Sequence, residues 1–218
     1  MYCSMQVFLR IATAIALLTV GCMTAAGQTV GWIEANTGSA RPVGRLADLQ
    51  DGGLLLALAV ERGHGPGWTF RAVATHAEFR ADERQRPSYA DAPWLPFDLD
   101  SWTLGLQLVH RSAAAPVSVV PALGLSADYL RSTPVYDGST LEGRRLREIY
   151  PAAEASLQFR WRPVHRFEAL AEVRGHVLFT GTRDTEILFE AAGSAAGHEE
   201  GTRWLAYFPV AVGIRFAL

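Results

Sequence analysis

Residues 153–162 alternate strictly between apolar and polar side chains, and this period of two constrains the fold more than any other feature of the sequence. Successive side chains of a β-strand point to opposite faces, so the alternation predicts a strand with one apolar and one polar face. The same period recurs in the segments 54–60, 102–108, 117–129, 166–179 and 204–218. The chain is therefore predicted to be an all-β protein built from two-faced strands.

Two further segments complete a count of eight strands. His76 and Glu78 interrupt the apolar face of 68–79, and 29–35 is assigned mainly because the count requires a first strand. The connections alternate between short and long: the short ones are 64–67, 112–116 and 163–165, and the long ones, rich in glycine, proline and charge, are 36–52, 81–100, 132–148 and 182–202. This alternation predicts an antiparallel, eight-stranded up-and-down meander with both ends of the chain on the same side.

The positions of the aromatic residues decide which way the apolar faces point. A soluble eight-stranded barrel turns its apolar faces inward and has no reason to sort its rings toward both ends. Here the apolar faces carry aromatic residues near the short turns and again near the long connections, with aliphatic or small residues between them. The two groups are Trp68, Phe70, Phe159, Trp161, Phe167 and Phe216, and Trp102, Tyr129, Phe179, Trp204 and Phe208. Two aromatic girdles around an aliphatic band predict a transmembrane β-barrel.

The first 27 residues are predicted to be a cleaved signal peptide, followed by a barrel domain at 28–218. Arg10, the apolar run 11–20 and the small residues 24–27 follow the order of a secretory signal. A membrane anchor is the alternative, but the run is shorter than the roughly 20 residues that span a bilayer. Cys22 follows a degraded lipoprotein box, which leaves lipidation as a second alternative. Because Cys3 and Cys22 are the only cysteines, the mature chain is expected to contain no disulfide.

The end of the sequence carries a motif of the same kind of protein. Gly213, Phe216 and Leu218 match the terminal signal of outer-membrane barrels, although Ala211 stands where a polar residue is usual. With its strand pattern, the chain resembles the small bacterial outer-membrane β-barrels, the class of the barrel domain of outer-membrane protein A. The resemblance implies insertion into the cell outer membrane by the assembly machinery, contact with membrane lipid and lipopolysaccharide, and a monomeric barrel.

The polar faces of the strands predict a lumen filled by a network of charged side chains. Its expected members are Glu61, Arg71, Asp128, Glu154, Arg160, Glu168, Glu172, Arg174, His176 and Arg215. A turn at 163–165 would set Arg160 opposite Glu168 and Glu154 opposite Arg174, and the turn at 64–67 would set Glu61 opposite Arg71. An eight-stranded barrel is only just wide enough for its own side chains, so no continuous channel is expected.

Catalytic and metal chemistry is not predicted. Ser126, Asp128 and His176 are interpreted as lumen residues. His110 and Ser112 have the His-x-Ser spacing of the lipid A deacylases, but they sit at a short turn, the end away from the outer leaflet. The six histidines show no zinc-ligand spacing, and no cofactor is expected.

The composition argues against two further classes and leaves three functions open. The chain has 218 residues, is 49% hydrophobic and has a formal net charge of −2, which argues against disorder and against a nucleic-acid partner. Long connections with exposed aromatics such as Trp94 and Phe97 favour a structural or surface-binding role. A narrow pore or small-molecule carrier is the alternative, and a lipid-modifying enzyme comes third.

Overall fold

The computed structural model describes residues 30–48, 50–62, 66–81, 97–112, 115–134, 147–181 and 204–218. Eight long strands account for most of them: β1 (Val30–Val43), β3 (Gly53–Arg62), β4 (Gly67–Ala81), β5 (Phe97–Arg111), β6 (Val117–Pro134), β7 (Arg147–Val164), β8 (Phe167–Phe179) and β9 (Trp204–Ala217). A short 3-10 helix, η1 (Gly44–Asp48), and a two-residue strand, β2 (Gln50–Asp51), lie between β1 and β3. Within these ranges, no helix is long and apolar enough to cross a membrane.

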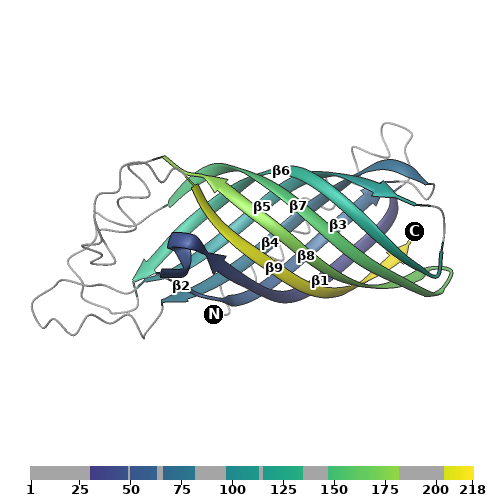
Figure 1. The fold of residues 1–218 in the computed structure, drawn as a ribbon, viewed down its shortest axis with the longest axis horizontal. Coiled ribbons are helices and arrows are strands. Elements are labelled where there is room, and N and C mark those ends of the chain that lie inside the picture. The colour runs from purple at the N-terminus through teal and green to yellow at the C-terminus, as the bar shows by residue number, and fades with distance from the viewer. Residues whose placement is uncertain are drawn as a thin grey trace, which may run out of the picture.

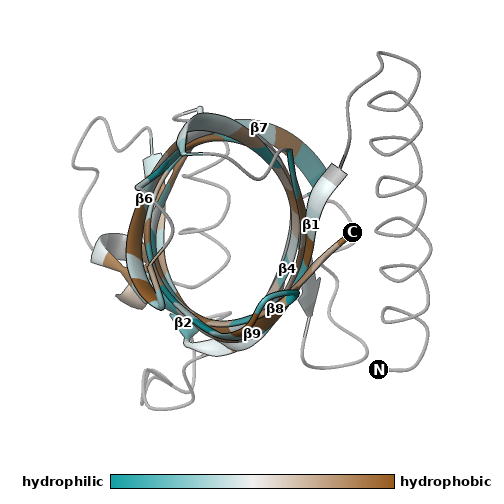
Figure 2. Ribbon diagram, turned by 90° about the vertical axis from the view of Figure 1, so that its right-hand side faces the viewer, coloured by the Kyte–Doolittle hydropathy of each residue, from teal (hydrophilic) through white to brown (hydrophobic). Residues whose placement is uncertain are grey.

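The long strands form a closed antiparallel barrel. Their order around the ring is β1, β3, β4, β5, β6, β7, β8 and β9, and the ring closes because β1 pairs with both β3 and β9. At the seam, the Leu218 amide donates a hydrogen bond of 3.2 Å to the Gly31 carbonyl. Figure 1 shows the strands tilted along the barrel, and the end-on view of Figure 2 shows the ring. The predicted up-and-down β-barrel is confirmed.

The two ends of the barrel differ. The strands β3, β5, β7 and β9 run toward one end of the barrel, where the C-terminus lies, and β1, β4, β6 and β8 run toward the other (Figure 1). We call these the turn end and the loop end. In barrels of this kind the short turns are periplasmic and the longer loops are extracellular.

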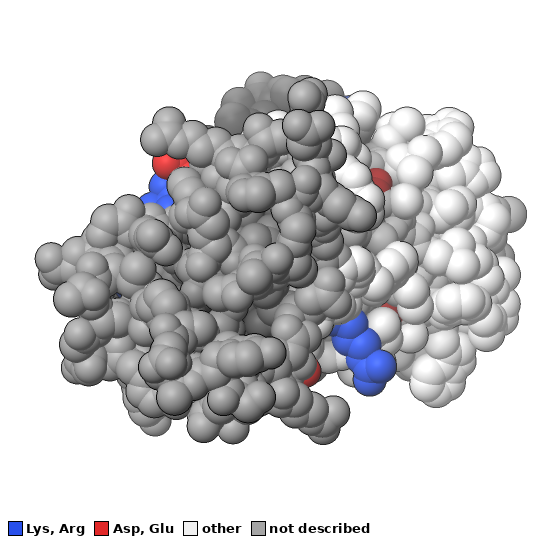
Figure 3. Space-filling view, turned by 60° about the vertical axis from the view of Figure 1, so that its left-hand side comes forward, with Lys and Arg blue, Asp and Glu red and all other residues white. Residues whose placement is uncertain are grey.

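The apolar faces point outward, as predicted. Along β7, buried and exposed residues alternate over most of the strand, and the exposed ones include Leu157, Phe159 and Trp161. Near the loop end Phe179 and Trp204 are about half exposed on the same outer wall. The described part of the outer wall at the right of Figure 3 is largely uncharged. A surface of this kind would be unstable in water but is stabilised by hydrocarbon, with the aromatic rings at the two interfaces.

The first strand is longer than the sequence predicted, which is a correction. We expected a strand over 29–35 and a loop over 36–52, but β1 continues to Val43, and only residues 44–52 connect it to β3. The outward residues Thr37, Ser39 and Arg41 are polar, so the second half of β1 lacks the apolar stripe. Its strand conformation is set by hydrogen-bonded neighbours on both sides, β3 and β9. One of the four connections expected to be long is therefore short.

The register of the β7–β8 hairpin also differs from the prediction, by two residues. Arg160 pairs with Leu170 instead of Glu168, and Glu154 pairs with His176 instead of Arg174. The physical reason is that the turn lies at His165 and Arg166, one to two residues later than assumed, and an irregularity follows Trp161 in the ladder. Because the shift is an even number, every side chain keeps its predicted face.

Candidate functional site

The lumen is the most highly organised polar site among the described residues. All ten side chains that the sequence assigned to the lumen are buried inside the barrel. They belong to six of the eight long strands: β3, β4, β6, β7, β8 and β9. Each is placed by the same rule, because alternate residues of a barrel strand point inward.

Near the turn end, Glu61 on β3 receives hydrogen bonds from three arginines. Arg160 on β7 and Arg215 on β9 donate to its Oε2 over 2.9 and 2.7 Å, and Arg111 on β5 donates to its Oε1. Strands β3 and β7 are four apart in a ring of eight, so the Glu61–Arg160 bond crosses the full width of the lumen. Arg71 lies directly opposite Glu61 in the ladder, as predicted, but its side chain reaches other partners.

In the middle of the barrel, Arg71 on β4 bonds the opposite strand. Its two Nη atoms donate to the two carboxylate oxygens of Glu172 on β8 over 3.1 and 3.2 Å. Arg71 also donates to Glu34 on β1 and, over 2.6 Å, to Gln107 on β5. Strands β4 and β8 are again four apart in the ring, so this bidentate pair is a second ion-pair bridge across the lumen.

Further toward the loop end, Arg174, Glu154, His176 and Asp128 form a third layer. Arg174 Nη1 lies 3.3 Å from Glu154 Oε2, so these two residues meet although they are not direct partners in the ladder. His176 Nε2 lies 2.9 Å from Asp128 Oδ2, and its Nδ1 lies 3.6 Å from Glu154 Oε2. Asp128 also accepts hydrogen bonds from three hydroxyl groups, those of Ser101, Thr103 and Ser126. Since Ser126 donates to the acid and not to the histidine, this layer does not have the arrangement of a nucleophile with its base.

Trp32, Glu34 and Arg111 are among the lumen residues that the sequence analysis missed. The Trp32 ring lies beneath the guanidinium groups of Arg215, Arg162 and Arg111, whose carbons are 4.8, 5.3 and 5.9 Å from its centroid. Trp32 and Glu34 belong to the segment with the weakest pattern. Arg111 lies on the same inward face as Gln107 and Val109, so the period of two along β5 would have identified Arg111 as a lumen residue.

The loop-end part of the lumen is apolar instead of charged. Its buried side chains include Leu55, Phe79, Leu99, Leu130, Tyr150, Leu178, Leu205 and Tyr207. Phe79 and Tyr207 meet edge to face with their centroids 5.1 Å apart, and the Tyr207 ring lies 4.6 Å from that of His176. Tyr207 thus joins the apolar core to the charged layers.

The residues of the terminal motif lie on the closing strand. Phe216 and Leu218 are 49% and 66% exposed on the outer wall, where they would contact lipid. Gly213 lies on the inner side beside Asn36, where a Cβ atom would come within 2.4 Å of the Ala35 carbonyl oxygen. The glycine is thus needed for close packing of β9 on β1, independently of any recognition of the motif by the assembly machinery.

The two residues of the His-x-Ser pair lie at the end of β5. His110 is on the outer wall, where its ring meets that of Trp68 at 4.8 Å. Arg111 turns inward to Glu61, and Ser112 is exposed just beyond the end of β5. The pair is at the turn end, as expected. The predicted signal peptide, Cys22 and most of the long connections lie outside the described residues.

No family model matches this sequence, and no curated protein is similar to it in sequence. Solved structures do share its fold. The crystal structure of Neisserial surface protein A is similar with a TM-score of 0.50 and 12% identity, over 86% of this chain and 96% of that one. A major outer membrane protein from Thermus thermophilus is similar with a TM-score of 0.54 and 11% identity, over 87% of this chain and 100% of that one.

At such low identity these similarities show the fold alone. The fold is that of the eight-stranded bacterial outer-membrane β-barrels. The apolar outer wall with its two aromatic girdles suits a bilayer, and the polar groups are turned inward. The chain is an integral β-barrel protein of the outer membrane.

Proposed function

We propose that this protein has a structural or surface-binding role in the outer membrane and is neither an open pore nor an enzyme. The observation that carries the proposal is the pair of ion-pair bridges, Glu61–Arg160 and Arg71–Glu172, that join opposite strands across the lumen. Side chains that meet across the full width leave no room for a solute. The apolar core at the loop end supports the same conclusion.

A blocked lumen leaves the surfaces outside it as the places where binding can occur. The connections 82–96, 135–146 and 182–203 are the longest in the sequence, and the first contains Trp94 as well as several charged residues. Loops on a rigid scaffold are the usual site of recognition, because they vary without disturbing the strands. We propose lipopolysaccharide and membrane lipid as the immediate partners, the assembly machinery as a transient one, and a monomeric barrel.

Planar-bilayer recording tests the blocked lumen. The refolded wild-type protein is expected to show no steady conductance. A double variant, Arg71→Ser with Glu172→Ser, removes one bridge and leaves the net charge of the lumen unchanged. Once heat-modifiable migration has shown that this variant is folded, it should conduct more than the wild type. A steady ohmic channel from the wild type would refute the proposal in favour of a pore.

Incubation with lipid tests the absence of enzyme activity. Phospholipid vesicles and purified lipopolysaccharide should be recovered unchanged by mass spectrometry after incubation with the refolded protein. Release of fatty acid that disappears in His110→Ala would instead identify a lipid hydrolase that uses the His-x-Ser pair. Light scattering after size exclusion tests the monomer separately.

A further inference from the structure

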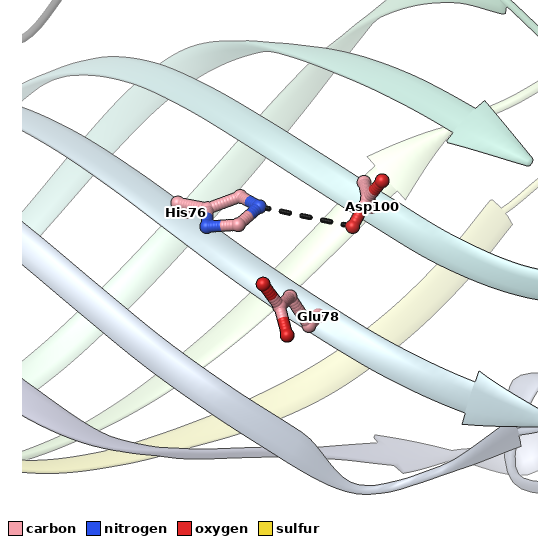
Figure 4. A group of neighbouring side chains, drawn as sticks. All are labelled: His76, Glu78 and Asp100. Atoms are coloured by element: carbon pink, nitrogen blue, oxygen red, sulfur yellow. Dashed lines mark ion pairs between the residues drawn. The ribbon is translucent and has the colours of Figure 1, made fainter. Parts of the chain in front are cut away.

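Three ionisable side chains interrupt the apolar outer wall toward the loop end. His76 and Glu78 lie on β4, and Asp100 lies on the adjacent strand β5 (Figure 4). In the ladder, Glu78 pairs directly with Asp100, and His76 pairs with Trp102. The candidate ligand atoms of the three residues all lie within 4.8 Å of one another, and His76 Nε2 is 3.8 Å from Asp100 Oδ1. His76 is buried, and both acids are half-buried.

The two carboxylates occupy an unfavourable arrangement for a protein without a bound cation. Like charges directly opposite one another on neighbouring strands destabilise a sheet, and the effect is larger next to hydrocarbon than in water. Arg131 on β6 lies opposite Asp100 on its other side, and Arg80 follows two residues after Glu78. These arginines balance the charge of the region, but the ladder still places the two acids side by side, with an imidazole next to them.

The imidazole is held in a defined position. Its ring stacks on Trp102 with the centroids 4.0 Å apart and an angle of 26° between the planes. In Figure 4 the ring points an edge nitrogen toward Asp100, and Glu78 lies beside it. Within the described part of the chain, no other group of three or more such side chains meets the distances that a metal ion requires. Stacking fixes the ring before any ligand arrives, which reduces the entropy lost on binding.

We propose that His76, Glu78 and Asp100 form a binding site for a divalent transition-metal ion, of which Zn²⁺ is the best fit. Imidazole nitrogen and carboxylate oxygen are both zinc ligands, and three protein ligands leave one tetrahedral position for water or another donor. Ligand atoms bound to one zinc ion lie about 3.4 Å apart, so these atoms, which lie within 4.8 Å of one another, would move closer together when the ion binds. The ion would convert the repulsion between the two acids into coordination.

The site escaped the sequence analysis because its residues are not in a local motif. His76 and Glu78 are two residues apart, and Asp100 joins them only through the β4–β5 register. The neighbour Trp102 belongs to the loop-end aromatic girdle, so the site lies near the membrane interface. Its open position would then face the head-group region, which is reachable by ions from the outside.

Zinc binding by the refolded, untagged mature protein in detergent micelles tests the proposal. After removal of metal with a chelator, titration with Zn²⁺ alone is followed by calorimetry, and Co²⁺ is added in parallel for its ligand-field absorption. We expect one ion per barrel. His76→Ala, Glu78→Gln and Asp100→Asn should each weaken binding by about tenfold or more, since even the hydrogen-bonding partners of metal ligands contribute roughly 10–100-fold.

The matched control is His110→Ala. Like His76, His110 lies on the outer wall beside a tryptophan, but it is on β5 at the turn end, and its tryptophan is Trp68. This variant should bind zinc as tightly as the wild type, and all variants are first shown to be folded by heat-modifiable migration. Absence of zinc binding by the wild type, or binding that survives the triple substitution of His76, Glu78 and Asp100, would overturn the proposal. An equal loss in His110→Ala would overturn it as well.

Discussion

The two parts of the lumen are filled by opposite kinds of side chain. Toward the turn end, long arginine and glutamate side chains reach across the barrel and meet in pairs, as Arg71 and Glu172 do. Toward the loop end, residues such as Leu130 and Leu178 pack into an apolar core. The two kinds of filling should fail differently. Loss of one charged partner strands a buried charge, whereas loss of an apolar side chain leaves a cavity.

The largest effect is expected from Glu61→Ala. Three arginines donate to this carboxylate, and its removal leaves them without their shared acceptor in a buried site. The free energy of unfolding should fall by roughly 3–5 kcal/mol, measured by urea titration of the protein refolded in lipid vesicles. Glu148→Ala, at an exposed position near the loop end, is the control and should change it little. An effect below that of the control would mean that the arginines are solvated.

Leu178→Ala tests the apolar part. The side chain is 1% exposed among other apolar residues, so truncation should lower the free energy of unfolding by about 3 kcal/mol through lost contacts and a residual cavity. Leu178→Met nearly conserves the volume and should cost less than about 1.5 kcal/mol. If both variants had the same stability, the loop end would not be tightly packed, and the contrast between the two regions would fail.

A double-mutant cycle on Glu154 and Arg174 separates direct pairing from burial. Each single alanine variant should be less stable than the wild type, because each leaves a buried charge with one opposite charge fewer. Glu154→Ala leaves Arg174 with Glu172, and Arg174→Ala leaves Glu154 with His176. The double variant should lose less than the sum by about 1–2 kcal/mol, since these residues are in contact. Strict additivity, measured by the same urea titrations, would show that the two charges are independent despite the 3.3 Å between them.

The smallest effect is expected at the end of the outer wall. Leu218→Asp places a charge at the end of β9, near the interface, where the cost falls to about 1 kcal/mol or less. Val210→Asp on the same wall, further from the strand end, should cost roughly 2 kcal/mol and impair assembly more. Heat-modifiable migration and the amount of folded protein in outer-membrane fractions report both. An equal effect of the two would argue against lipid contact along β9.

Alternation was enough to predict which residues lie in the lumen but not which of them meet. The face of a residue depends only on its odd or even position, so Glu172 and Arg215 were assigned inward correctly without knowledge of the register. Glu61 and Arg160 are far apart in sequence and meet only because strand tilt brings them to one level. The second half of β1 was missed because its outward face carries Thr37 and Ser39, and its neighbours impose the strand.

The seam between β1 and β9 has a consequence for the time course of folding. These strands pair from Trp32 with Ala217 to Val43 with Ala206, so the contacts that close the ring join residues very distant in the sequence. Loop-closure entropy must be overcome before such contacts stabilise anything, which makes closure a slow and late step. Until then both strands present open edges that would pair with other chains. The docking of β9, with its apolar Phe216, therefore ends the period in which the barrel is vulnerable to aggregation.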